Sequence, residues 1–297
     1  MKAFAENPLL AHSLRMRFWR DPRPAARVVR VAAGSAYGLM LLVMLIGMVW
    51  TSSVGDALRI VFFVGLTMVF LFVPIFLAPQ FAGERERRTW DDIIVTPLTP
   101  RELVEGKLLG GMYWVGLLLL SWSPFVVVSL FLPRVVDPGT NPPLKLSDVA
   151  AVLGMLLVVA VTAWAVAGLT LLRSMLTTRT FRAMAQVWVA FIGVLALTWA
   201  IAEVLKLFTY GSYSYSGSRS PLSEVIAAVN PYVLVQEYLL PVVSRAWVPY
   251  ASPPTSFWEA QRPLLGYALI YGLTGLLCLR PLLRRLRALD RQVRERR

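Results

Sequence analysis

The sequence predicts an all-α membrane protein that crosses the lipid bilayer with six helices. The chain has 297 residues, of which 57% are hydrophobic and only 16% are charged, and its mean hydropathy is +0.62. Soluble domains contain about half apolar and about a quarter charged residues. A helix needs about 20 mostly apolar residues to cross the hydrocarbon core. Six segments of the chain meet that condition, at 31–50, 60–80, 110–132, 149–172, 183–203 and 264–283.

The distribution of basic residues predicts which connections lie in the cytoplasm. Of the 30 lysines and arginines, 23 lie in the N-terminal segment, in the connections between spans 2 and 3 and between spans 4 and 5, or in the C-terminal tail. Basic residues beside spans are retained in the cytoplasm. We therefore expect both termini to be cytoplasmic in a cell membrane, with a bacterial inner membrane as the expected location. The net charge of +13 then reflects topology and contact with anionic lipids, not binding to nucleic acid.

The rare residue types exclude several kinds of chemistry. Cys278 is the single cysteine and His12 the single histidine, so an intrachain disulfide and a multi-histidine metal site are both excluded. No phosphate-binding loop of the form GxxxxGK[ST] occurs. The ionisable residues of the spans lie at span ends, which argues against a proton- or sodium-driven carrier. We therefore expect no catalytic residue, metal or cofactor in this chain, and a source of energy outside it.

The first 30 residues predict a short helix in the inner membrane interface. Proline after Asn7 suits the first helical turn, and apolar residues recur every four positions while arginines face elsewhere. Such a basic amphipathic helix lies along the membrane surface and contacts lipid. Packing of the same helix beside the spans is compatible with this position. Its predicted residues are Pro8, Leu10, Leu14, Arg15, Arg17 and Phe18.

Spans 1 to 5 are expected over residues 31–203. A short outer loop is predicted at 51–57, and Pro74 should bend the inner end of span 2. Gly34 and Gly38 in span 1 would let another helix backbone approach closely. That second helix belongs either to the same subunit or to a neighbouring subunit, and the sequence leaves both possibilities open.

The connection over residues 81–107 is the most distinctive part of the chain. It opens with charged residues and continues as a short predicted amphipathic helix, which Thr89 can cap and Pro97 ends. The apolar side of this helix consists of Trp90, Ile93 and Ile94. Such a segment is typical of a docking element for a cytoplasmic partner, and the alternative is a solvated charged loop.

The outer connection between spans 5 and 6, residues 204–262, predicts short helices that lie in or dip into the outer leaflet. One helical pattern ends at Asn230, and a second apolar segment should be stopped by Pro241. Residues 263–297 form span 6 and a basic tail that continues it as a helix. This tail either lies along the membrane or contacts a cytoplasmic subunit. Together with the interfacial helix at 1–30, the whole chain forms one transmembrane domain.

Several stretches of the sequence resemble the permeases of ABC-2-type transporters. In the 81–107 connection these are Gly83-Glu-Arg-Glu-x-x-Thr-Trp-Asp91, Thr96-Pro-Leu-Thr99, and Glu102 with Gly106-Lys107. Near the N-terminus, Asn7-Pro-Leu-Leu10 with Leu14-Arg-x-Arg17 is similar to the amphipathic start of the same family. The six-span layout and the long connection between spans 5 and 6 agree with it. One position departs, because the family often has glycine where this chain has Arg88.

The resemblance implies that this chain is the membrane-spanning permease subunit of an ATP-driven exporter. A separate ABC ATPase subunit would bind ATP and Mg²⁺, and a second permease subunit, identical or a sister chain, would complete the pathway. The 81–107 connection would be the coupling element that docks into the ATPase. The residues that the resemblance assigns to this element are Glu84, Arg85, Glu86, Thr89, Trp90, Asp91, Ile93, Ile94, Thr96, Pro97, Gly106 and Lys107.

Two other classes of function stay open on the sequence alone. An ATP-independent carrier or channel would work without any ATPase. A membrane-embedded enzyme would need polar catalytic groups at one depth, and the sequence shows no such group. Lipids, hydrophobic drugs, glycans and peptides all remain candidate substrates.

Overall fold

The protein is helical throughout the part of the chain that the structure describes. The computed structural model describes residues 24–51, 53–90, 99–136, 144–210, 221–244 and 257–295, and none of them forms a strand. The predicted interfacial helix lies before this part. The predicted coupling helix beyond Trp90 also lies outside it.

Five helices of the described part are long and apolar enough to cross a membrane, which makes the chain a multi-pass membrane protein. Helix α4 (Pro24–Trp50) carries a shorter apolar stretch over Gly34–Trp50, so the sixth crossing stays a prediction. The five long helices are α5 (Val54–Leu77), α8 (Pro100–Val136), α9 (Leu146–Leu176), α10 (Thr180–Tyr210) and α14 (Phe257–Glu295).

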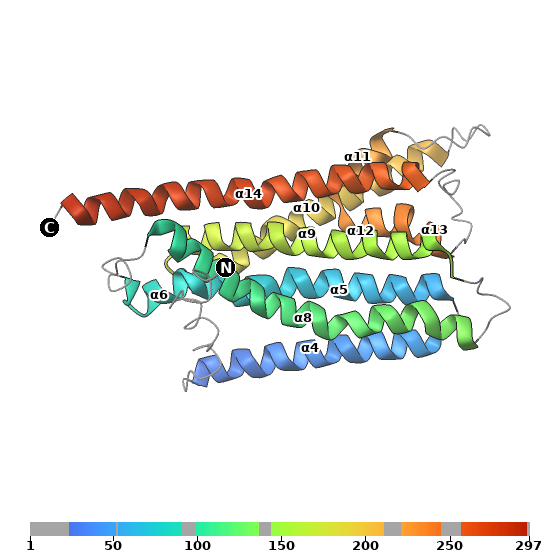
Figure 1. Cartoon of the computed structure of the whole chain (residues 1–297), viewed down its shortest axis with the longest axis horizontal. Helices are drawn as coiled ribbons and strands as arrows, with labels where there is room; N and C mark the ends of the chain where they lie inside the picture. Colours follow the sequence, from blue (N-terminus) through green and yellow to red (C-terminus); the bar gives the residue numbers. More distant parts are fainter. Residues whose placement is uncertain are drawn as a thin grey trace.

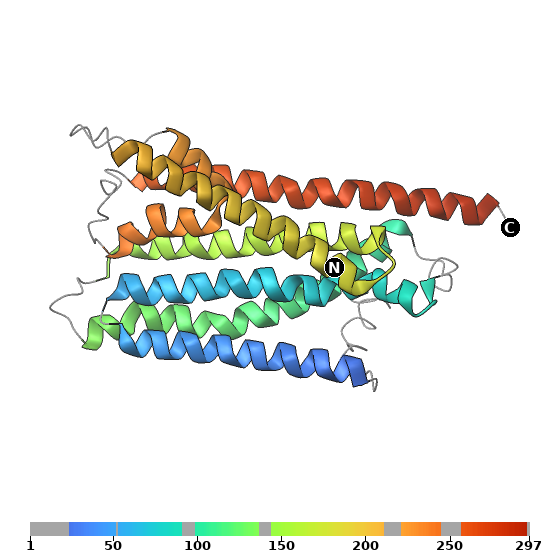
Figure 2. The same cartoon turned by 180° about the vertical axis from the view of Figure 1, so that it is seen from behind.

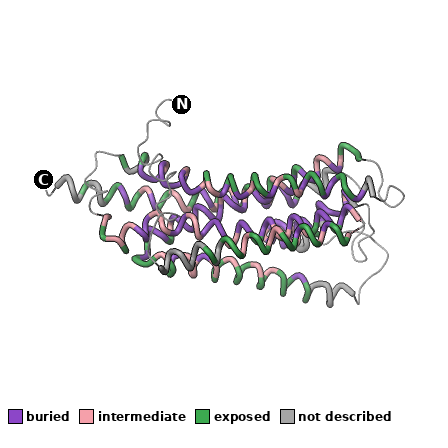
Figure 3. Tube along the Cα trace, turned by 90° about the horizontal axis from the view of Figure 1, so that it is seen from below, coloured by how far each residue is buried: buried purple, intermediate pink, exposed green. Residues whose placement is uncertain are grey.

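The long helices run side by side, with α4 and α14 on opposite flanks of the bundle (Figures 1 and 2). Helices α5 and α9 are the most enclosed, because 56% of the most apolar stretch of each is buried, against 11% for α10. Figure 3 shows buried residues along the inner sides of the helices and exposed residues along the outer sides. An exposed apolar surface of this kind suits contact with lipid. We call the end of the bundle that carries the short helix α6 (Ala82–Glu86) the α6 end.

Helix α5 differs from its predicted boundaries at both ends. It begins at Val54, so the outer loop predicted at 51–57 is shorter than expected. Asp56 and Arg59 form an ion pair at 3.5 Å on its first turns, which keeps two charged residues in helical structure. At the other end the regular α-helix stops at Leu77, three residues after Pro74, and a 3₁₀ turn, η1 (Ala78–Gln80), leads into α6. Proline removes one backbone donor and weakens the helix around it.

The connection between α10 and α14 contains short helices, as predicted. These are α11 (Pro221–Val229), α12 (Pro231–Leu234), a π-helical turn η2 (Val235–Leu239) and α13 (Leu240–Ser244). Asn230 separates α11 from α12, and its side chain accepts hydrogen bonds from the backbone of Tyr232 and Val233 at 3.0 and 3.3 Å.

The prediction that Pro241 stops this segment is wrong, because α13 continues through it to Ser244. The π-helical turn directly before it explains the difference. Proline lacks the backbone N–H that a regular α-helix needs, and a π turn shifts the hydrogen-bond pattern by one residue. The N–H of Leu240 accordingly donates to the carbonyl of Val235.

Two glycines permit close contacts between helices of the bundle. A Cβ atom on Gly65 of α5 would lie 2.6 Å from the ring of Trp122 of α8, a buried side chain that donates to the Val61 carbonyl at 3.0 Å. A Cβ atom on Gly168 of α9 would lie 2.8 Å from the backbone oxygen of Gly275 of α14.

The close approach predicted at Gly34 and Gly38 does not occur within the described part of this chain, since nothing there lies within 4 Å of either position. Their helix α4 is on the flank of the bundle (Figure 1). A role for these glycines between subunits therefore stays a prediction.

We predict that Gly168→Ala destabilises the protein. The added methyl group meets the α14 backbone, which cannot rotate away, and overpacking of this kind costs about 1–3 kcal/mol. The midpoint of thermal unfolding in detergent should fall. Gly193→Ala on α10 is the matched control, because Gly193 has open space around it. Alanine favours a helix by about 0.5–1 kcal/mol over glycine, so the control should keep or raise the midpoint. Equal midpoints for the two variants would contradict the close contact.

Candidate functional site

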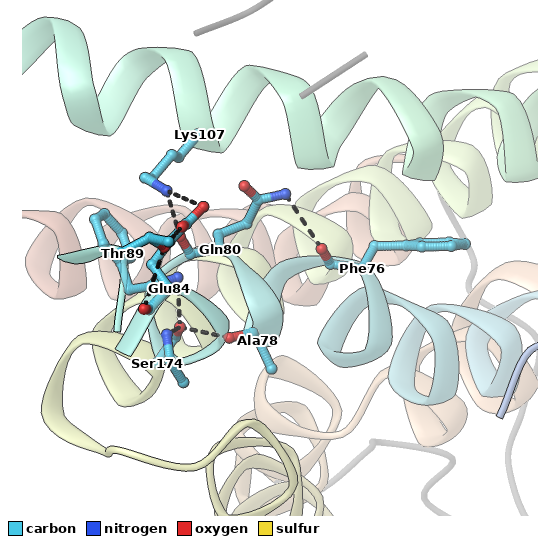
Figure 4. A network of polar contacts seen from close by, with 9 residues as sticks. Phe76, Ala78, Gln80, Glu84, Thr89, Lys107 and Ser174 are labelled. Atoms are coloured by element: carbon cyan, nitrogen blue, oxygen red, sulfur yellow. Dashed lines mark hydrogen bonds and ion pairs between the residues drawn. The ribbon is translucent and has the colours of Figure 1, made fainter. Parts of the chain in front are cut away.

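The first part of the predicted coupling connection lies against the ends of three long helices. Figure 4 shows how polar side chains from α6, α8 and α9 converge where α5 ends. We call this cluster the polar junction. It consists of Glu84, Arg85, Glu86, Lys107, Ser174 and Thr180.

Ser174 near the end of α9 holds the turn between α5 and α6. Its side chain is fully buried, and its hydroxyl donates to the carbonyl of Ala78 at 2.6 Å. The same oxygen accepts from the backbone N–H groups of Phe81 and Ala82 at 3.1 and 2.9 Å. These N–H groups belong to the first turn of α6, where a helix has no internal partners for its donors. One hydroxyl from a residue more than 90 positions away therefore performs the task of a helix cap.

Lys107 is a buried cation at the start of α8. It is only 5% exposed, and its ammonium group donates to the carbonyl of Gln80 and lies 3.7 Å from a carboxylate oxygen of Glu84. The ammonium group also lies 5.1 Å from the centre of the Phe81 ring. A buried charge is tolerated only when it is paired and hydrogen-bonded. These contacts therefore fix α8 against the turn that follows α5.

Arg85 reaches from α6 to the end of α9. Its guanidinium donates to the carbonyls of Met175 at 2.6 Å and Thr177 at 3.3 Å. The last carbonyls of a helix lack internal donors, and a cation there also matches the helix dipole. Burial lowers the pKa of the Arg85 guanidinium, and the nearby positive charge of Arg285 on α14 lowers it further. An arginine nevertheless stays protonated in proteins, so this contact persists at any physiological pH.

Glu86 reaches from α6 to the start of α10. Its carboxylate accepts from both the backbone N–H and the hydroxyl of Thr180, each at 2.8 Å. Thr180 is the first residue of α10, so the negative charge lies at the positive end of that helix dipole. Arg85 and Glu86 together attach α6 to both sides of the short turn between α9 and α10.

Arg88 occupies a backbone conformation that favours glycine. Its φ angle is 57°, and the N–H groups of Arg88 and Thr89 donate to the carbonyls of Arg85 and Glu84 at 3.1 and 3.0 Å. This pair of hydrogen bonds is the Schellman motif, in which glycine usually takes the left-handed position. Arg88 is the position at which the sequence departs from the ABC-2-type permeases that it resembles. It is also the one residue of this turn where glycine would be unstrained.

Thr89 and Trp90 fold back onto the chain. The Thr89 hydroxyl donates to the carboxylate of Glu84, five residues earlier. The helix that Thr89 is predicted to cap continues beyond the described residues. Trp90 is half-buried, with its ring 6.0 Å from that of Phe81 and 4.9 Å from the Arg85 guanidinium. Part of the ring is thus occupied within the chain, and the remainder is free for a partner.

Two further motif residues, Thr99 and Glu102, start helix α8. The Glu102 carboxylate accepts from the backbone N–H of Thr99 at 2.8 Å, and the Glu102 N–H donates to the Thr99 hydroxyl at 3.3 Å. This reciprocal pair is a capping box. It defines where the connection ends and the rigid helix begins.

The structure therefore brings together some of the predicted coupling residues. Glu84, Arg85, Glu86, Thr89, Trp90 and Lys107 meet at the polar junction, and Gly106 is buried beside it on α8. The other predicted residues lie outside the described part of the chain: Asp91, Ile93, Ile94, Thr96 and Pro97, together with the interfacial residues Pro8, Leu10, Leu14, Arg15, Arg17 and Phe18.

Sequence reasoning missed Ser174, Thr180 and the carbonyl of Met175. A single serine at the end of an apolar span belongs to no motif. Only the structure shows that this side chain is fully buried. Within the described residues, no group of three or more His, Cys, Asp or Glu side chains could hold a metal ion. The junction is a mechanical connection, because its contacts join one short helix to the ends of three long helices.

In comparisons with known proteins, no protein-family profile and no curated protein sequence matches this chain.

We predict that Arg88→Gly stabilises the protein. The left-handed conformation costs a residue with a side chain about 1–2 kcal/mol, and glycine removes that cost while the hydrogen bonds of the turn remain. The midpoint of thermal unfolding should rise by roughly 2–3 °C. The neighbouring Arg87→Gly is the control, because Arg87 has a φ angle of −88° and no strain to release. A rise in both variants, or in neither, would argue against a strained turn.

Proposed function

We propose that this chain is the permease subunit of an ABC-2-type transporter, most simply an exporter. The observation that carries the proposal is the polar junction. The residues that resemble the coupling motif of that family lie on a short helix, α6, that is bonded to α8, α9 and α10 at once. A solvated charged loop would need none of these contacts.

The junction suggests how the work of an ATPase would reach the membrane. A partner that moves the connection would displace α6. Lys107 would pass that displacement to α8, and Arg85 and Glu86 would pass it to the turn between α9 and α10. Along the chain, the connection would pass movement directly only to the two spans that flank it. The contacts with α9 and α10 extend it to two further helices.

The orientation of the chain belongs to the same proposal. The excess of basic residues would place the α6 end in the cytoplasm, where a soluble ATPase can reach it. Helix α4 has 27 residues, or about 40 Å at 1.5 Å per residue, which is long enough for a sixth crossing. Two permease subunits and two ATPase subunits would then form the transporter.

The intrachain contacts change which substitutions test docking cleanly. Glu84→Lys would place a second cation beside the buried Lys107, and Trp90→Ala would remove packing on Phe81, so both would disturb folding as well as docking. Ile94→Asp is the sharper docking variant on the sequence-based assignment. Arg85→Ala and Glu86→Ala instead test the transmission of movement within the permease.

The orientation predicts the accessibility of single cysteines. In a Cys278→Ser background, Leu144→Cys lies at the end of the bundle opposite to α6 and Thr178→Cys lies in the turn between α9 and α10. Both positions are exposed. In intact cells an impermeant thiol reagent should label the cysteine at 144, and it should label the one at 178 only after the membrane is opened. The reverse pattern would place the α6 end outside and remove the basis for an ATPase there.

The proposal also predicts a partner with ATPase activity. The full chain, purified with a tag from its own host, should bring down a protein that a photoreactive ATP analogue labels, in a complex with two copies of each subunit. The chain alone should not hydrolyse ATP. A preparation that transports its substrate without any ATPase would instead support a carrier or channel.

Different substitutions should impair the binding of the ATPase and the transmission of movement to the helices. Ile94→Asp should weaken ATPase binding by roughly thirtyfold, about 2 kcal/mol. Glu86→Ala should leave binding intact but lower transport per ATP hydrolysed by roughly twofold to thirtyfold. Glu224→Ala is the matched control, because Glu224 also lies in the first turn of a helix, α11, at the other end of the bundle. Full coupling in the Glu86 variant would rule out the transmission role.

A further inference from the structure

Helix α14 is longer than a membrane crossing requires. It runs unbroken for 39 residues, from Phe257 to Glu295, and Pro281 lies within it without ending it. At 1.5 Å per residue this is about 58 Å, against a hydrocarbon core of about 30 Å. Figures 1 and 2 show that α14 runs beside the other long helices and continues past their ends at the α6 end. The tail therefore projects away from the bundle along the direction of the spans.

The C-terminal part of α14, from Arg280 onward, carries different residues on two of its sides. Leu282 and Leu286 are buried and pack into the core. Four exposed arginines lie on another side, which we call the arginine stripe: Arg280, Arg284, Arg287 and Arg291. Their spacings of four, three and four residues place them on one helix face. Residues 280–297 contain eight arginines but only two acidic residues, so this face is strongly positive.

Arginines three or four residues apart on a helix repel one another. Negative charge opposite such a row would offset this repulsion. Two sources of negative charge exist at a cytoplasmic membrane surface, namely the headgroups of anionic lipids and the acidic surface of a soluble protein. The position of the stripe along α14 distinguishes between them.

A membrane position that follows the predicted sixth span would put the far end of the stripe beyond the lipid headgroups. A crossing of about 20 residues that starts at Pro263 ends near Leu282. Arg291 is nine residues further along the helix, or about 13 Å. The headgroup layer of one leaflet is only about 5–8 Å thick. Arg280 and Arg284 can contact headgroups, but Arg291 on a helix that keeps this direction is above them.

We propose that the outer end of the arginine stripe, Arg291 together with Arg287 at the edge of the headgroup layer, docks against an acidic surface of the ATPase subunit. This inference rests on the proposed function, since it needs that subunit beneath the α6 end. The stripe would be a second contact with the ATPase, in addition to the predicted coupling element. The C-terminal part of α14 and helix α6 lie at the same end of the bundle (Figure 1), so one subunit beneath that end can reach both contacts.

The second contact has a defined role. Charged groups at the rim of an interface chiefly guide association and fix the orientation of the partner. The apolar residues of the coupling element would hold the ATPase, and the arginine stripe would set its rotation beneath the bundle. Binding through the stripe should accordingly weaken as the salt concentration rises.

The test uses the full chain in lipid nanodiscs and the ATPase subunit identified by co-purification. Arg287→Glu with Arg291→Glu should weaken binding by roughly tenfold or more, because like charges across an interface are strongly unfavourable. Arg287→Gln with Arg291→Gln should give an intermediate loss and a smaller dependence of affinity on salt. Arg59→Glu, which also reverses an exposed arginine but at the opposite end, should bind like the unaltered chain. Size-exclusion chromatography verifies that each variant is folded.

The outcomes separate the inference from the function on which it rests. If no ATPase binds the unaltered chain, the proposed function fails. If the ATPase binds the unaltered chain and the double Glu variant equally well, the inference alone is wrong. The remaining outcome combines two results. If the ATPase binds both chains with equal affinity, and the double Glu variant is retained less well on vesicles of phosphatidylglycerol, the stripe is assigned to lipid.

Discussion

Helix ends that lie near a membrane surface leave backbone groups without internal partners, and the arrangement of the α6 end follows from meeting that need. Four elements meet in space there: the turn after α5, the end of α9, and the starts of α6 and α10. Several of the free donors and acceptors there are bonded by side chains from another element. Ser174 completes the start of α6, Arg85 the end of α9, and Glu86 the start of α10. No single helix end at this junction is complete without its neighbours.

This reciprocity explains why the charges are where they are. A buried ion pair such as Lys107 with Glu84 adds little net stability, because both ions lose their hydration. Its value lies in specificity, since either charge left alone would be costly. The charges of the connection thus hold one geometry of four helices. The same residues that resemble a docking motif in sequence also hold the helices of this bundle together.

The sequence predicted the parts of the fold that depend on composition along the chain. Long apolar runs identify the crossing helices, and the Asn230–Pro231 pair marks a helix boundary, because both signals are local. The internal role of Arg85 and Glu86 was not predictable in this way. Their partners Met175 and Thr180 lie about 90 residues away, and neither belongs to a recognisable motif. Pro241 misled the prediction for a related reason, since a π-helical turn that accommodates a proline has no sequence signature. Arg88 was flagged by its departure from the family pattern, but only the backbone angle shows what that departure means.

The contact of Gly168 with Gly275 divides helix α9 into two unequal arms. Backbone meets backbone there, so α9 cannot come closer to α14 at this point. The arm from Gly168 to Leu176 at the α6 end is about 12 Å long, and the arm from Gly168 back to Leu146 is about 33 Å long, at 1.5 Å per residue. Helices α9 and α14 also meet along the long arm, where a Cβ atom on Gly154 would lie 3.2 Å from the Leu264 side chain and Thr162 is hydrogen-bonded to Tyr267 at 2.5 Å. The two helices are therefore packed as one unit, and a force applied to the short arm at the α6 end would be borne by both.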